Sequence, residues 1–496
     1  MKYFSTRGDG RRVTSSETIL QGLAADGGLF VPEEIPQVEP EFIKELAPVS
    51  YEIRAAEILG LLLDDYDSLE LATCLFHAYG GNKFDGTQKA PLVYPAVDTA
   101  VLELWHGPTS AFKDMALQLL PHLITCALKK NNIREDLLIL VATSGDTGKA
   151  ALAGFSDVAR TKVQVFYPAD GVSEMQRRQM VTTPGKNVQV TAVKGNFDDA
   201  QTGVKEIFHD ANFAAKLGAA GVKLSSANSI NWGRLAPQIV YYFSAYADML
   251  AAERITMGEK VNFVVPTGNF GDILAGFYAK MMGLPVGKLI CASNANDVLT
   301  EFLRTGVYNA KRNFYKTISP SMDILVSSNL ERLLYHLTQD TATVSNRMAE
   351  LARTGRYEVS AAVLAKLQEH FWAGSANDAE TKATIKHTFD AWNYLADPHT
   401  AVALKVAADY RQATGDKRHM VILSTASPYK FCSDVLDALQ IEATGLDDFA
   451  KLDKLSQISR TTAPRNLASL KDAAVRFTAV VDKTEMAQAT ENFARA

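Results

Sequence analysis

A series of short apolar runs separated by helical patterns constrains the fold of this 496-residue chain more than any other feature. The runs lie at residues 137–142, 163–167, 188–193, 261–265, 289–292 and 420–424. The run Leu-Leu-Ile-Leu-Val-Ala at 137–142 has no polar alternation, as expected for a strand buried on both faces. Strands that alternate with helices form parallel sheets flanked by helices. The sequence therefore predicts an α/β fold with a mostly parallel sheet.

Three of the predicted strands end in small polar loops that lead into helices. The loops are Thr-Ser-Gly-Asp-Thr-Gly at 143–148, Pro-Thr-Gly-Asn-Phe-Gly-Asp at 266–272 and Thr-Ala-Ser-Pro at 425–428. In an open α/β sheet, ligands bind beyond the carboxyl ends of the strands. Glycine lets backbone N–H groups approach a phosphate, and a helix N-terminus favours the anion. One such loop is weak evidence, but three in one sheet indicate a ligand site.

Lys113 lies in the stretch His-Gly-Pro-Thr-Ser-Ala-Phe-Lys-Asp-Met-Ala-Leu-Gln at 106–118. The stretch follows an apolar run at 101–105, so we expect this lysine in the first turn of a helix, beside a strand end. The helix dipole disfavours an ammonium there, and partial burial also favours the neutral amine. A neutral lysine amine can form a Schiff base with an aldehyde. Taken alone, the stretch is better explained by a surface lysine near a helix start.

Composition and charge exclude several classes of protein. The net charge is −5 and no basic block occurs, which argues against nucleic acid or an anionic membrane as the partner. The N-terminus lacks the apolar core of a signal peptide, and no apolar run approaches the roughly 18 residues that span a bilayer. Four dispersed cysteines fit reduced thiols in a cytoplasmic protein better than disulfides or zinc. The nine histidines show no metal-ligand spacing, so no metal site is expected.

Two further segments allow more than one interpretation. Gly-Asp-Thr-Gly-Lys at 145–149 resembles part of a P-loop, but its glycines lack the required gap and Ala150 replaces the magnesium-binding hydroxyl. The segment at 225–235 is dense in amides and hydroxyls and contains Arg234. It is equally compatible with an anion-binding site and with a hydrogen-bonded loop that caps a helix.

Several long motifs resemble the threonine synthase family, and they occur in the same order. They are Tyr-x-Ser-Thr-Arg at 3–7, Gln-Gly-Leu-Ala-x-Asp-Gly-Gly-Leu-Phe-Val-Pro at 21–32, the lysine motif at 106–116, Thr-Ser-Gly-Asp-Thr-Gly-Lys-Ala-Ala at 143–151, Asn-Ser-Ile-Asn-Trp-Gly-Arg at 228–234, Pro-Thr-Gly-Asn-Phe-Gly-Asp at 266–272 and Asp-Pro-His-Thr-Ala-Val at 397–402. The resemblance runs from the first residues to about 435 and is closest to the longer branch of the family.

The resemblance implies an enzyme with the tryptophan synthase β-like fold that uses pyridoxal 5′-phosphate. Lys113 would form the Schiff base with the cofactor, and Thr425 would hydrogen-bond the pyridine nitrogen. The residues implied around the cofactor phosphate are Gly268, Asn269, Phe270 and Asp272. Asp146 stands where many enzymes of this fold place an asparagine against the ring hydroxyl, which leaves its contact with the ring open. Ser427 stands where a histidine is expected.

The family reaction converts O-phospho-L-homoserine and water to L-threonine and phosphate. The resemblance implies that Lys113, once displaced by the substrate amine, acts as the base at Cα. Candidate contacts are Ser144 and Thr147 for the substrate carboxylate, and Asn231 and Arg234 for its phosphate. A phospholyase or dehydratase that gives a 2-oxo acid on the same cofactor is an alternative, as is a non-catalytic binding module.

The chain is too long for one hydrophobic core, so several domains are expected. We expect a small N-terminal domain at 1–95, a pyridoxal-phosphate-binding catalytic region at 96–440 and a C-terminal segment at 441–496. Residues 300–400 interrupt the α/β pattern and are expected to form a helical insertion, and a closing strand is predicted at 474–481. The sequence does not distinguish a monomer from a homodimer.

Overall fold

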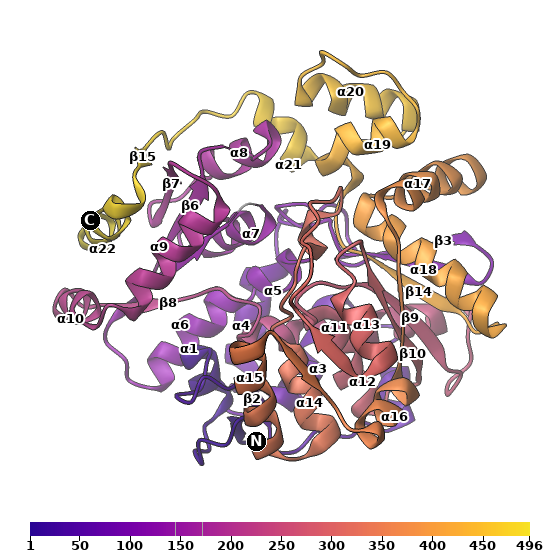
Figure 1. Ribbon diagram of the computed structural model, residues 1–496, viewed down its shortest axis with the longest axis horizontal. Helices are drawn as coiled ribbons and strands as arrows, with labels where there is room; N and C mark the ends of the chain where they lie inside the picture. Colours follow the sequence, from indigo (N-terminus) through magenta and orange to yellow (C-terminus); the bar gives the residue numbers. More distant parts are fainter. Residues whose placement is uncertain (144, 171) are drawn as a thin grey trace.

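Two sheets with mostly parallel strands form the framework of the computed structural model, which describes residues 1–496 except 144 and 171 (Figure 1). The larger sheet has the strand order β13 (Phe371–Ser375), β10 (Val286–Ser293), β9 (Val261–Pro266), β14 (Met420–Ser424), β4 (Thr99–Glu103) and β3 (Leu92–Ala96). Its strands pair in parallel except for the edge pair β3–β4, which is antiparallel.

The second sheet is parallel throughout its paired strands. Its order is β15 (Val480–Val481), β7 (Val188–Val193), β6 (Thr161–Pro168), β5 (Asp136–Ala142) and β8 (Val222–Ser225). All the apolar runs predicted as strands form strands, because each is buried between helical layers. The expectation that the three polar loops lie in one sheet is wrong. The loop at 143–148 follows β5 of this sheet, whereas the other two follow β9 and β14 of the larger sheet.

Helices cover both faces of the larger sheet. Phe263 and Val265 of β9 pack into the core that includes α11 (Trp232–Ala251) and α12 (Gly271–Met281). Their neighbour Val264 points to the opposite face, into the core formed with α18 (Pro398–Thr414). Residues that alternate along one strand therefore enter two different cores, which explains the lack of polar alternation in the sequence.

The second sheet is covered in the same way. The helices around it and around the junction between the sheets are α5 (Asp114–Leu117), α6 (Leu120–Lys130), α7 (Asp146–Phe155), α8 (Glu174–Val181), α9 (Phe197–His209), α10 (Ala211–Ala219) and α22 (Met486–Arg495). α9, α10 and α22 contribute to the core on one face, together with Leu138 and Leu140 of β5. Ile139 and Val141 face the main core, which also contains residues of α6 and α7.

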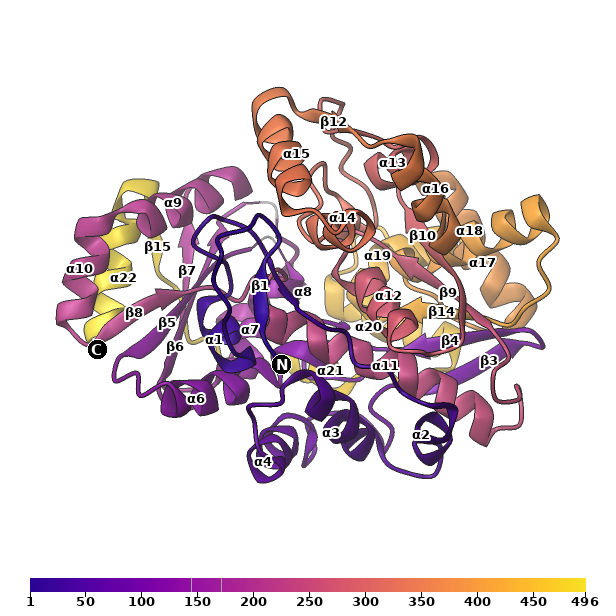
Figure 2. The same cartoon turned by 90° about the horizontal axis from the view of Figure 1, so that it is seen from below.

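The N-terminal elements pack against the main core (Figure 2). They are β1 (Tyr3–Ser5) and β2 (Phe30–Pro32), which pair antiparallel, and the helices α1 (Ser15–Gln21), α2 (Pro40–Glu45), α3 (Tyr51–Leu62) and α4 (Ser68–Tyr79). α3 lies against α11 and α1 lies against α6. The N-terminal part of the chain thus packs against a helix next to the larger sheet, α11, and a helix next to the second sheet, α6.

The segment at 300–400 is only partly helical. It contains α13 (Val298–Thr305), α14 (Leu330–Thr338), α15 (Thr341–Thr354), α16 (Ala361–His370), α17 (Asp378–Trp392) and the short antiparallel pair of β11 (Val307–Asn309) and β12 (Arg356–Glu358). It also supplies β13, the edge strand of the larger sheet. The helices expected in this segment are present, and the aromatic and small residues at 371–375 add a strand because they pair with β10.

The C-terminal part continues from β14 through α19 (Cys432–Ala438), α20 (Asp448–Ser459) and α21 (Arg465–Ala468). The strand predicted at 474–481 is reduced to Val480–Val481, which pairs with β7. The four cysteines are free thiols, and three of them are buried. None of the described helices is long and apolar enough to cross a membrane.

Candidate active site

Lys113 lies where the carboxyl ends of the two sheets meet. It immediately precedes α5, and only 13% of its side chain is exposed. Its loop is attached to the end of β14, because Phe112 N–H donates to the carbonyl oxygen of Thr425 at 2.8 Å. On the other side, its Nζ lies 3.9 Å from Oδ2 of Asp146, which begins α7 after β5 of the second sheet.

Burial lowers the pKa of Lys113 to about 8, and the nearby carboxylate of Asp146 limits this decrease. The positive charges of Lys430 and Arg234 lower the pKa further. The helix α5 has only four residues, so desolvation rather than the helix dipole dominates. A substantial fraction of this amine is therefore neutral near pH 8, as a nucleophile or a proton acceptor requires.

Asp146 is surrounded by three lysine side chains. Its Oδ1 lies 3.0 Å from Nζ of Lys149 and accepts a hydrogen bond from Lys430, while its Oδ2 faces Lys113. Burial alone would raise the pKa of Asp146, but the three ammonium groups together lower it well below its ordinary value. Asp146 is therefore an anion in the folded protein.

The buried charges at this site are not balanced. Three lysines and the guanidinium of Arg234 are buried here, against the carboxylates of Asp146, Asp114 and Asp272, whose charges act on Lys113. One nitrogen of that guanidinium donates to the carbonyl of Ala227 at 2.6 Å, whereas no described residue accepts a hydrogen bond from its Nε. Burial lowers the pKa of Arg234 to about 10. Because uncompensated buried charge is costly, the excess of cations indicates a site for an anion.

The loop at 268–271 forms a backbone cradle at the start of α12. No described residue accepts a hydrogen bond from the backbone N–H of Gly268, Asn269, Phe270 or Gly271. Phe270 has a left-handed backbone with φ of 62°, which is unusual for a bulky residue and turns the chain sharply into the helix. Successive free amides at a helix start fit a phosphate group.

The backbone of the segment at Ser321 passes so close to the first position of this cradle that only glycine fits there. A Cβ atom on Gly268 would lie 2.8 Å from the carbonyl oxygen of Ser321, so a side chain would displace one of the two segments. Ser327 Oγ also donates to the carbonyl of Gly268 at 2.9 Å. The segment at 319–327 thus forms one wall of the cradle.

Asp272, the last residue of this loop, points away from the cradle amides. Its Oδ1 accepts hydrogen bonds from the hydroxyls of Tyr241 and Tyr242 on α11, at 2.6 and 2.9 Å. Burial raises the pKa of Asp272 to about 6, although the two tyrosine hydroxyls lower it. The side chain therefore ties α12 to α11 and keeps its charge away from the anion site.

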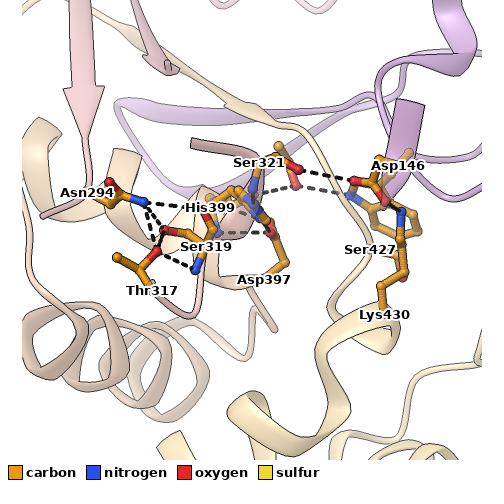
Figure 3. A network of polar contacts seen from close by, with 12 residues as sticks. Asp146, Asn294, Thr317, Ser319, Ser321, Asp397, His399, Ser427 and Lys430 are labelled. Atoms are coloured by element: carbon orange, nitrogen blue, oxygen red, sulfur yellow. Dashed lines mark hydrogen bonds and ion pairs between the residues drawn. The ribbon is translucent and has the colours of Figure 1, made fainter. Parts of the chain in front are cut away.

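A polar network supports the wall that carries Ser321 (Figure 3). Nδ1 of His399 lies 2.7 Å from Oδ2 of Asp397, and its Nε2 accepts a hydrogen bond from Ser321 N–H at 3.1 Å. Ser321 Oγ in turn donates to Oδ2 of Asp146 at 3.3 Å. Asn294 at the end of β10 donates to the hydroxyls of Thr317 and Ser319 in the same segment. The network links the ends of the two sheets across the site.

The structure brings together Lys113, Arg234 and the end of β14 with Thr425. Thr147 is half-buried in the first turn of α7, next to Asp146. The amide of Asn231 caps α11 through Gly233 N–H and donates to the carbonyl of Ile19. Its contact with the substrate stays a prediction. Ser144 lies outside the described residues.

The sequence did not reveal the parts played by Lys149, Lys430 and Ser321. Lys149 stands in a P-loop-like fragment, and Lys430 follows a loop whose sequence carries no charge pattern. Only their proximity to Asp146 in space shows that they belong to the site. Among the described residues, no group of three or more His, Cys, Asp or Glu side chains is arranged to hold a metal ion.

The sequence matches known families over most of its length. Residues 99–426 match the family described as "Pyridoxal-phosphate dependent enzyme". Residues 2–79 match "Threonine synthase N terminus" and residues 400–490 match "Threonine synthase, C-terminal". The fold and the site, with its buried lysine and phosphate cradle, therefore define an enzyme of the pyridoxal-phosphate-dependent class.

Known relatives identify the family more closely. The chain is 40% identical to threonine synthase of Eremothecium gossypii over 470 residues, which cover 88% of this chain and 89% of that protein. It is 42% identical over 439 residues to "Threonine synthase-like 1" of Homo sapiens, where the match covers 86% of this chain and 58% of the human protein. A structure of pyridoxal-phosphate-bound threonine synthase from Brucella melitensis superposes with a TM-score of 0.89 at 38% identity and covers 100% of both chains. The chain belongs to the threonine synthase family, which confirms the predicted family and fold.

Proposed function

We propose that this protein is a threonine synthase, which converts O-phospho-L-homoserine and water to L-threonine and phosphate with pyridoxal 5′-phosphate as cofactor. The observation that carries the proposal is the buried Lys113, with its lowered pKa, between a backbone phosphate cradle and an excess of buried cations. Relatives in Saccharomyces cerevisiae and Methylobacillus glycogenes are threonine synthases, which supports the same conclusion.

The residues present fit the cofactor. The free amides at 268–271 suit its phosphate, and Lys113 is the amine that would bind its aldehyde. Thr425 stands at the end of β14 beside the lysine loop, where its hydroxyl would meet the pyridine nitrogen. When bound, the cofactor would stabilise the negative charge that develops on the substrate carbon after loss of a proton.

Lys113 is the group that would move protons in this reaction. The burial that lowers its pKa to about 8 lets the amine take a proton at Cα and return it at neutral to mildly alkaline pH. Asp146 at 3.9 Å prevents the pKa from falling further, so the amine alternates between its two forms. A single positioned amine is then sufficient for successive transfers at adjacent carbons.

Arg234 and Lys430, whose charges act on Lys113, would hold the substrate phosphate and stabilise it as it leaves. Arg234 offers a guanidinium with an unpartnered Nε among the described residues, and a fork of this kind suits phosphate. Thr147 at the start of α7 is the remaining described candidate for the substrate carboxylate. Both proposed substrate contacts are supported by position, because Arg234 acts on Lys113 and Thr147 follows Asp146 in the first turn of α7.

A phosphate-release assay with O-phospho-L-homoserine, followed by identification of the amino-acid product, tests this function. We expect one L-threonine for each phosphate. A 2-oxo acid with ammonia would instead establish the phospholyase or dehydratase, and absence of both cofactor and turnover would establish a non-catalytic relative. Lys113→Ala should lose the visible absorption band of the bound cofactor and about 10²–10⁴-fold in kcat. Normal turnover in that variant would contradict the role of Lys113.

The proposal includes a cytoplasmic location, which the four free cysteines support. No partner other than the small-molecule substrate is proposed. The protein would work as a monomer or a homodimer, and sedimentation of the purified enzyme distinguishes the two.

A further inference from the structure

A cavity of about 560 Å³ lies beside the active site. Its wall is formed by the loop at 107–109, by α7 and α8, and by the C-terminal segment around α21. Lys113, Asp146, the cradle at 268–271 and Thr425 do not line it. Lys149 does, so this side chain separates the cavity from Asp146. A volume of this size is suitable for a small organic molecule.

Buried polar atoms that line this cavity lack hydrogen-bond partners. Among the described residues, nothing bonds to either amide atom of Gln118 or to Oε1 of Gln179, and Nζ of Lys149 has the Asp146 carboxylate as its one ion-pair partner, which leaves N–H groups of the ammonium to spare. Gln118 and Lys149 are each only 1% exposed. Buried polar groups are normally paired, so a cluster of unpaired ones around one cavity calls for an occupant.

Other polar groups of the wall are already paired and fix its shape. Nδ2 of Asn466 on α21 donates to the carbonyl of Gly107 at 3.0 Å. Oδ1 of the same asparagine accepts a hydrogen bond from Ser110 Oγ at 3.1 Å. Ser156 Oγ donates to the carbonyl of Pro184 at 2.9 Å. These hydrogen bonds fix the wall of the cavity, and the unpaired polar groups lie on that fixed wall.

We propose that this cavity binds a small anion of amino-acid size that carries both an acidic oxygen group and a hydrogen-bond donor. The acidic oxygens accept hydrogen bonds from Lys149 Nζ and Gln118 Nε2. The donor, a hydroxyl or an acidic hydrogen, serves the free carbonyl oxygens of Gln118 and Gln179. The charged side chains of the wall support this choice, because Lys83, Lys149 and Arg465 face a single acid, Asp85. The acidic group is a carboxylate or a phosphate.

Lys149 couples this cavity to the active site. Its Nζ is 3.0 Å from Oδ1 of Asp146, and the other oxygen of that carboxylate is 3.9 Å from Nζ of Lys113. A bound anion competes with Asp146 for the Lys149 ammonium and leaves the carboxylate more available to Lys113. Burial and the charge of Lys430 lower the pKa of Lys149 to about 7, so an anion beside it raises this pKa and draws in a proton.

Titration calorimetry of the holoenzyme at pH 8 tests the proposal with two probes that lack an amine, inorganic phosphate and L-malate. We expect saturable binding of at least one probe, with uptake of up to about one proton when two buffers of different ionisation enthalpy are compared. L-malate should bind roughly 5-fold or more tightly than succinate, which lacks the hydroxyl donor. Binding of malate alone identifies a carboxylate ligand, and binding of phosphate alone identifies a phosphate ligand.

Variants separate this cavity from the active site, where phosphate would also bind as a reaction product. Gln118→Leu and Gln179→Leu remove cavity groups without touching Asp146, and each should weaken binding at the cavity about 10-fold or more. Lys149→Met should abolish the proton uptake. The matched control is Gln164→Leu, because that glutamine is equally buried and unpaired among the described residues but lies on β6, outside the cavity.

The inference does not depend on the reaction at Lys113, since binding is measured without substrate. Absence of saturable binding by either probe overturns it. So does unchanged binding in both Gln118→Leu and Gln179→Leu when thermal unfolding and cofactor content show that the variants are folded.

Discussion

Replacing Asp146 by asparagine should lower the pKa of Lys113. Asp146 is the carboxylate whose charge most raises that pKa, and its Oδ2 lies 3.9 Å from the amine. Opposite charges about 4 Å apart attract by about 4 kcal/mol at an effective dielectric constant of about 20, which corresponds to about 3 pKa units. Water that enters beside the asparagine reduces the effect, so we expect a decrease of roughly 1–3 units from the present value of about 8.

The rate of cofactor binding measures this pKa, because only the neutral amine condenses with the aldehyde. Cofactor-free protein is mixed with pyridoxal phosphate between pH 5 and pH 10, and the rise of the visible band is followed by stopped flow. The midpoint of the rate profile should fall from about 8 to roughly 5–7 in Asp146→Asn. Ser321→Ala is the control, because it removes the 3.3 Å hydrogen bond to Asp146 but leaves the charge in place. A midpoint that stays at 8 or rises in Asp146→Asn would refute the reasoning.

The same variant makes a prediction about stability. The folded-state pKa values of Lys113 and Lys149, about 8 and about 7, lie below the ordinary lysine value of 10.5. Between about pH 7 and pH 10.5, these lysines bind more protons in the unfolded chain than in the folded one. The free energy of unfolding therefore rises with pH over this range. Asp146→Asn should lower the folded-state pKa values of Lys113 and Lys149 further. The free energy of unfolding should then begin to rise at a lower pH and should rise by more. Urea titrations of the cofactor-free protein at pH 6, 7.5 and 9 measure the change.

Three further substitutions probe the supports of the site. Gly154→Ala on α7 should cost about 1–3 kcal/mol in urea unfolding, because its Cβ would overlap a carbonyl oxygen of α5, whereas Gly60→Ala has open space and should be neutral or stabilising. His399→Phe removes the acceptor of Ser321 N–H and should cost about 1–3 kcal/mol, with weaker cofactor binding by fluorescence titration. Burial raises the pKa of Asp272 to about 6, so the stability of the wild type should fall as pH rises from about 4 to 6. Melting temperatures of Asp272→Asn should show a smaller decline, because burial also raises the pKa of Asp114 to about 6 and that group is unchanged.

Local patterns predicted the strands but not their assembly. Runs such as 137–142 and 261–265 are apolar because each strand is covered on both faces, and this property is visible in the sequence. The same property does not show that one run belongs to a five-stranded sheet and the other to a six-stranded sheet. The division into units at 1–95, 96–440 and 441–496 stays a prediction.

The site could be predicted only where a motif carried it. Lys113 and the loop at 266–272 can be predicted because a sequence motif surrounds each of them. Lys430 and Ser321 reach Asp146 from segments about 284 and 175 residues away along the chain. Charge pairing across such separations leaves no periodicity in the sequence, so only the folded chain reveals it.

The charge distribution at the site favours a substrate that carries its own phosphate. The cofactor phosphate fits the backbone amides at 268–271, and this cradle uses no side-chain cation. Lys430 pairs with Asp146, and no described carboxylate forms an ion pair with the buried guanidinium of Arg234, although burying an unpaired cation is costly. An enzyme that removed water from an unphosphorylated amino acid would gain nothing from these cations. A second phosphate beside Lys113 balances them, and its departure as a dianion is the step that they would assist.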